Sequence, residues 1–118
     1  MPPATHAGGC HCGAVRFEAA ADLGQVIACN CSICMKRGAL WTLLPAAQFK
    51  LLRGDAALED YQFGPKRLHH LFCPTCGVGS FSRGQSPKGE DTVAVNVRCL
   101  DDINVTKLTP MPYDGKRR

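Results

Sequence analysis

The stretch Cys29-Asn30-Cys31-Ser32-Ile33-Cys34 places three thiols within six residues. Three thiolates this close repel one another, so the pKa of each would rise unless a bound cation or oxidation relieved the repulsion. A short loop of this kind is able to point its sulfurs at one metal ion, about 2.3 Å from each. A structural zinc ion takes four ligands, and this stretch supplies three. The spacing therefore predicts a metal site whose fourth ligand decides between a structural and a catalytic role.

Two further cysteine pairs supply a complete ligand set. Cys10-His11-Cys12 is flanked by glycines, and Cys73-Pro74-Thr75-Cys76 has the spacing of a zinc knuckle. Together the pairs offer four thiolates, the ligands of a closed tetrahedral structural site. We predict that Cys10, Cys12, Cys73 and Cys76 bind one zinc ion, which would close a long loop of the chain. The alternative is that one or both pairs are free or joined in disulfides.

Cys29, Cys31 and Cys34 then form a separate site with three possible interpretations. It is an open zinc site that takes water or a substrate thiol, a closed site completed by Cys99 or a histidine, or a redox-active or metal-free thiol cluster. Three thiolates outweigh the charge of the ion, so a zinc ion here would activate water poorly. It would be better suited to holding an incoming thiol as a nucleophilic thiolate. All-sulfur ligand sets of this kind favour zinc over iron in a β domain.

The residues around these clusters give weaker signals. Lys36 and Arg37 directly follow the three-cysteine stretch and are candidates for substrate binding through anionic groups, unless they are ordinary surface charges. His69 and His70 are adjacent on a predicted strand, so their side chains face opposite sides, one exposed and one packed. Trp41 is expected in the core.

The 118 residues are predicted to form a single, mainly β domain, residues 1–118. Short β-rich runs such as 14–19, 48–52 and 92–97 recur at intervals of about 8–12 residues, and no helical pattern exceeds about six residues. Residues 35–38 are predicted to form one helical turn that ends at Gly38. Two prolines near the end predict an irregular tail, residues 107–118.

Composition and charge narrow the class of protein. No run approaches 18 apolar residues, so no membrane span is expected. The formal charge of +4 falls to about +1 if seven thiolates bind two zinc ions, so the charge gives no reason to expect nucleic-acid binding. Met1 is followed by no apolar segment of a signal peptide, so we expect a cytoplasmic protein whose clustered thiols are reduced metal ligands.

The order and spacing of seven cysteines resemble those of the glutathione-dependent formaldehyde-activating enzyme family, which includes the centromere protein V type domains. The resemblance spans about residues 8–102. The motifs that carry it are Gly9-Cys10-His11-Cys12-Gly13-Ala14-Val15-Arg16-Phe17, Cys29-Asn30-Cys31-Ser32-Ile33-Cys34, Phe72-Cys73-Pro74-Thr75-Cys76-Gly77 and Leu100-Asp101-Asp102. Cys99 departs from the pattern, because a small residue such as serine is expected there.

The resemblance implies a β-tent fold of the type shared with methionine-R-sulfoxide reductases. It implies a structural zinc ion in the four-cysteine site and a catalytic zinc ion at Cys29, Cys31 and Cys34. The implied activity is that of a carbon–sulfur lyase, an S-(hydroxymethyl)glutathione synthase, which joins glutathione to formaldehyde. The expected partner is therefore a small-molecule thiol such as glutathione. The alternatives are a non-catalytic zinc-binding module and a thiol or zinc sensor of the same fold.

Overall fold

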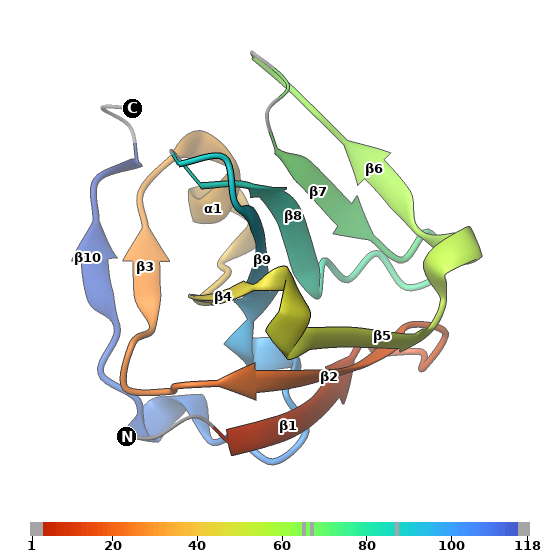
Figure 1. Ribbon diagram of the computed structural model, residues 1–118, viewed down its shortest axis with the longest axis horizontal. Coiled ribbons are helices and arrows are strands. Elements are labelled where there is room, and N and C mark those ends of the chain that lie inside the picture. Colours follow the sequence, from red (N-terminus) through yellow and green to blue (C-terminus); the bar gives the residue numbers. More distant parts are fainter. Residues whose placement is uncertain (1–3, 65, 67, 87, 116–118) are drawn as a thin grey trace.

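A computed structural model describes residues 4–64, 66, 68–86 and 88–115 (Figure 1). Among these residues the strands form two sheets, with orders β1-β2-β5 and β10-β3-β4-β9-β8-β7-β6. The strands are β1 Ala4–Gly9, β2 Arg16–Ala21, β3 Ile27–Cys29, β4 Trp41–Pro45, β5 Phe49–Arg53, β6 Glu59–Tyr61, β7 His69–Phe72, β8 Phe81–Gln85, β9 Asp91–Asn96 and β10 Met111–Tyr113. The predicted mainly β class is confirmed.

The helical segments are short. They are α1 Ser32–Arg37 and the 3₁₀ turns η1 Ala46–Gln48, η2 Asp55–Ala57, η3 Val97–Cys99 and η4 Val105–Lys107. Helix α1 ends where the sequence predicts, because Gly38 adopts the left-handed conformation (φ 68°) and donates its N–H to the carbonyl of Cys34 at 2.9 Å. The helix begins earlier than predicted, with Cys31 as its N-cap. None of the helices in the described part of the chain is long and apolar enough to cross a membrane.

The two sheets share one aromatic core. Phe17 of β2, Phe49 of β5 and Phe81 of β8 pack together with ring centroids 4.7–6.1 Å apart. Phe17 and Phe81 are fully buried. Figure 1 shows β1 and β2 running crosswise to β3 and β10. The smaller sheet therefore packs against the seven-stranded sheet around this core. Helix α1 packs against β3 and β4, where Cys34 contacts the group that contains Ile27 and Trp41.

The predicted irregular tail is wrong in part, since β10 lies within it. Met111–Tyr113 pairs in parallel with Ile27–Cys29 of β3. The backbone N–H of Met111 donates to Val26 and the carbonyl of Tyr113 accepts from Asn30, at 2.8 and 3.1 Å. Proline is tolerated in such an edge strand when its missing N–H is not needed for pairing. Residues 116–118 of the predicted tail lie outside the described residues.

Candidate metal centres

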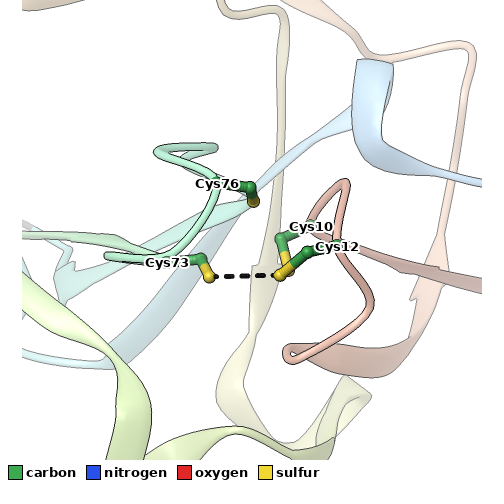
Figure 2. Close-up of side chains that lie close together, drawn as sticks. All are labelled: Cys10, Cys12, Cys73 and Cys76. Carbon is green, nitrogen blue, oxygen red and sulfur yellow. Dashed lines mark hydrogen bonds between the residues drawn. The ribbon is translucent and has the colours of Figure 1, made fainter.

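The four-cysteine cluster joins the two sheets. Cys10 and Cys12 lie in the turn between β1 and β2, and Cys73 and Cys76 lie in the turn between β7 and β8. Figure 2 shows the four side chains meeting from these two loops. Their sulfurs all lie within 4.8 Å of one another, and Cys12 Sγ is 3.7 Å from Cys10 Sγ and 3.6 Å from Cys73 Sγ. A tetrahedral zinc–thiolate site has sulfurs about 3.8 Å apart, because each lies about 2.3 Å from the ion. The donor set and spacing therefore fit a zinc ion.

Backbone amides surround this cluster and favour thiolates. The amides of Cys12 and then Val78 lower the pKa of Cys76 to about 6. The amides of Cys76 and Thr75 lower the pKa of Cys73, and the N–H of Val15 donates to Cys10 Sγ at 3.3 Å. Metal ligation by cysteine requires deprotonated sulfur. The loops thus favour the thiolate form of Cys73 and Cys76. At Cys12 the amide of Ala14 also lowers the pKa, but the neighbouring Cys73 thiol and then burial raise it overall, to about 11, so this ligand loses its proton only when the metal binds.

The three-cysteine cluster lies at the junction of β3 and α1. Cys29 ends β3, Cys31 caps α1 and Cys34 lies within it, and the three sulfurs are within 4.8 Å of one another. The N–H of Cys31 donates to Cys29 Sγ at 3.4 Å, and the indole N–H of Trp41 donates to Cys34 Sγ at 3.2 Å. Burial raises the pKa of Cys34 to about 12. Binding of a metal ion would displace this proton, so the metal affinity of the cluster should rise as the pH rises.

Cys99 does not complete the three-cysteine cluster. Burial raises its pKa to about 11, and the thiols that add to this rise are Cys10 and Cys76 of the other cluster. In the part of the chain that the structure describes, no further cysteine, histidine, aspartate or glutamate joins Cys29, Cys31 and Cys34 in a metal-binding group. The alternative of a site closed by Cys99 or a histidine therefore has no support in the fold.

A pocket of about 400 Å³ opens beside α1. It is lined by Ser32, Ile33, Lys36, Arg37, Tyr61 and Phe63. Lys36 is exposed and Arg37 is half-buried. The rings of Tyr61 and Phe63 are stacked, with centroids 5.8 Å apart. Among the described residues the lining carries two cations and no carboxylate, so it favours a ligand with an anionic group and an apolar part.

The pocket brings the two predicted substrate-binding residues together with two that the sequence does not single out. Tyr61 and Phe63 follow α1 by more than twenty residues of chain, so their place beside α1 depends on the tertiary fold. Both rings are partly exposed, Tyr61 by 50% and Phe63 by 40%. The exposure of these two aromatic rings is what marks them as pocket residues. Exposure is visible in the structure but not in the sequence.

Comparison with known proteins identifies the family. The model of the family described as glutathione-dependent formaldehyde-activating enzyme matches residues 5–112. The chain belongs to this family. The chain is also similar to a Rhodobacter sphaeroides protein of known crystal structure, with a TM-score of 0.80 and 33% sequence identity over 90% of this chain and 97% of that one. The predicted family is thereby confirmed, and the match includes both cysteine clusters and the pocket.

Membership of the glutathione-dependent formaldehyde-activating enzyme family bears on the chemistry of the site. The family is generally enzymatic, and its name describes the activation of formaldehyde with glutathione. Two groups of cysteines in this member could each hold a metal ion. The family name and the sulfur-rich site therefore agree on thiol chemistry.

In this family member the C-terminal segment forms one wall of the three-cysteine cluster. The side-chain amide of Asn30 donates to Asp114 at 3.0 Å, and the N–H of Asn30 donates to the carbonyl of Tyr113. These bonds bring Gly115 against the cluster. A Cβ added at Gly115 would lie 2.4 Å from Cys29 Sγ. Only glycine leaves room for the sulfur at this point.

We expect Gly115→Ala to weaken metal binding at the three-cysteine cluster. The methyl group would push Cys29 Sγ from its position, and displacing groups next to metal ligands commonly costs about 10- to 100-fold in affinity. Competition with a chromophoric chelator measures the two metal sites separately. The four-cysteine cluster serves as the internal control and should keep its affinity. Equal affinities in the variant and the parent protein would show that Gly115 has no such role.

Proposed function

We propose that this family member is a zinc-dependent carbon–sulfur lyase that reversibly joins glutathione and formaldehyde to give S-(hydroxymethyl)glutathione. The observation that carries the proposal is the three-cysteine cluster without a fourth protein ligand among the described residues, next to a cationic pocket. In the forward direction a bond forms between the thiol sulfur and the carbonyl carbon. The thiol proton ends on the former carbonyl oxygen, so the product contains every atom of both reactants.

The two cysteine clusters have different roles in this proposal. The four-cysteine cluster holds a structural zinc ion between the sheets. Cys29, Cys31 and Cys34 would hold a second zinc ion, which would supply a position for a substrate thiol in its thiolate form. The chain orients two of these three ligands, Cys29 through the N–H of Cys31 and Cys34 through the indole N–H of Trp41. A hydrogen bond to a ligating sulfur orients it and moderates its charge.

The pocket beside α1 is the reason for proposing a substrate thiol that carries carboxylates. Lys36 and Arg37 would attract the carboxylates of glutathione, and the stacked rings of Tyr61 and Phe63 would contact its apolar parts. A volume of about 400 Å³ falls in the range of ligand pockets, about 300–1,000 Å³. We place the reaction in the cytoplasm, where thiols stay reduced.

The test is the rate at which adduct forms. Glutathione and formaldehyde combine without a catalyst, so NMR exchange spectroscopy at equilibrium should compare the interconversion rate with and without zinc-loaded protein. We expect a faster exchange in proportion to the protein concentration, and no acceleration by the same concentration of free zinc. An unchanged rate with metal confirmed at both clusters would contradict the lyase and favour a non-catalytic zinc module. Metal loss on mild oxidation, again without catalysis, would favour a sensor.

A further inference from the structure

One row of side chains connects the pocket to the three-cysteine cluster. Tyr61, His70, Ser82 and Ala94 pair directly across β6, β7, β8 and β9. Residues directly opposite in neighbouring strands point to the same face of a sheet. Tyr61 lines the pocket, and Ala94 packs against the buried group that contains Cys34. His70 and Ser82 therefore lie between the pocket and the candidate metal site.

Both residues carry a buried polar atom without a partner. His70 and Ser82 are each only 6% exposed. Neither His70 Nδ1 nor Ser82 Oγ makes a hydrogen bond within the described structure. Buried polar groups are nearly always paired, so two adjacent exceptions on one face need an explanation. A ligand that enters from the pocket would supply the missing partner.

Arg37 adds a third unpartnered atom on the same face. Its Nη1 is buried and has no hydrogen-bond partner among the residues that the structure describes. The guanidinium lies over the ring of Phe72, 5.8 Å from the centroid, and against Gly79, where an added Cβ would be 2.6 Å from Nη1. Phe72 is two residues beyond His70 on β7 and so shares its face. A buried cationic nitrogen without a partner favours an anion as its ligand.

The charges around His70 agree with this assignment. Burial and then the positive charge of Arg37 lower the pKa of His70, Asp60 opposes the shift and His69 adds to it. His70 is therefore neutral at pH 7, and its Nδ1–H tautomer is able to donate to an anion. The ring of Phe63 stacks on His70 with centroids 5.4 Å apart. Because Phe63 and Arg37 also line the pocket, the pocket leads to this buried position.

We propose that Arg37, His70 and Ser82 form a buried subsite that binds a carboxylate of the thiol ligand. This inference rests on the proposed function, which supplies the thiol. The guanidinium matches the two oxygens of a carboxylate, and His70 and Ser82 each provide a neutral donor. Arg37 lies three residues after Cys34, on the same side of α1. The thiol and the carboxylate of one ligand would thus be bound along one face of the helix, with Lys36 contributing only exposed charge.

The first experiment compares binding of thiols with and without a carboxylate. Zinc-loaded His70→Leu and Ser82→Ala should bind glutathione and 3-mercaptopropionate about tenfold more weakly than the parent protein, since a hydrogen bond to a charged group is lost. Binding of cysteamine, which has no carboxylate, should not change. His69→Leu is the matched control, because His69 is the neighbour on the opposite, exposed face of β7, and it should bind all three thiols normally. Calorimetry measures the affinities.

Thermal melting separates a binding role from a structural one. Replacing an unpartnered buried polar group by an apolar one should leave the melting temperature unchanged or raise it. A fall in melting temperature together with weaker binding of all thiols, cysteamine included, would assign His70 and Ser82 to the fold and overturn the proposal. Unchanged glutathione binding in both variants would overturn it as well.

The second experiment observes His70 directly. In protein with ¹³C-labelled histidine, a bound carboxylate should raise the pKa of His70, as seen in its NMR titration, with glutathione and 3-mercaptopropionate and not with cysteamine. An equal rise with inorganic phosphate alone would assign the position to free anions and contradict the proposal. If no thiol binds the three-cysteine cluster, the proposed function itself is contradicted. If the His70 and Ser82 variants bind thiols and catalyse the reaction as the parent protein does, the proposed function stands and the subsite is contradicted.

Discussion

Cys73→Ala should unfold the protein at ordinary temperature. Cys73 is fully buried, belongs to the core cluster and provides one quarter of the ligand set that connects the two sheets. Structural zinc in zinc-finger peptides contributes about 10–16 kcal/mol to folding, as much as the whole stability of a typical domain, about 5–15 kcal/mol. Circular dichroism and metal analysis of purified protein should show a chain without a cooperative melting transition and without metal at the four-cysteine site.

Cys99→Ala is the matched control for this variant. Cys99 lies near the same cluster but outside its ligand group, so its loss should leave the metal content intact and lower stability only slightly. Chelation of the parent protein should reproduce the effect of Cys73→Ala, and re-addition of zinc should reverse it. A Cys73→Ala protein that melts within a few degrees of the parent and retains metal in both clusters would contradict the structural role.

Cys31→Ser should abolish catalysis and leave the fold intact. The three-cysteine cluster lies at the half-exposed junction of β3 and α1, away from the core that Phe17, Phe49 and Phe81 form. A serine hydroxyl is a poor ligand for a soft thiolate site, so metal analysis should find one site lost and the other occupied. The interconversion of glutathione and S-(hydroxymethyl)glutathione should fall to the protein-free rate, while the melting temperature changes by only a few degrees.

The control for Cys31→Ser is Cys99→Ser, which makes the same chemical change at a cysteine outside the cluster. This variant should keep both metals and the full exchange rate. If Cys31→Ser loses its metal and still accelerates adduct formation, catalysis does not depend on the three-cysteine cluster. If Cys99→Ser loses activity, then the separation of Cys99 from the reaction is wrong.

Much of the fold could be predicted because the pattern is local. Alternating residues predict most strands, and Gly38 predicts the end of α1. Adjacent positions predict that one of His69 and His70 is exposed and the other packed, and the structure has His69 exposed and His70 buried. Cysteine spacing predicts which thiols come together, since each pair or triplet lies in one short turn.

The features that the sequence did not predict depend on tertiary contacts. β1 has the sequence ATHAGG, with few strand-forming residues, and it is held by its pairing with β2. β10 contains Pro112, which has no N–H to donate. The strand forms because the residues on either side, Met111 and Tyr113, make the hydrogen bonds to Val26 and Asn30 at the edge of the sheet. Cys99 was a candidate ligand for the three-cysteine cluster because its position in the fold was unknown. The pocket and the unpartnered atoms of His70 and Ser82 depend on which strands lie side by side.

The hydrogen bond from Trp41 to Cys34 has a practical consequence. Trp41 is the only tryptophan of the chain, and its indole N–H lies 3.2 Å from one sulfur of one cluster. A change of charge on that sulfur changes the surroundings of the single strong fluorophore. Intrinsic tryptophan emission is therefore a built-in optical signal for the three-cysteine site, whereas the four-cysteine site has no tryptophan. A metal titration followed at this emission would report the order in which the two clusters fill, without a label or a mutation.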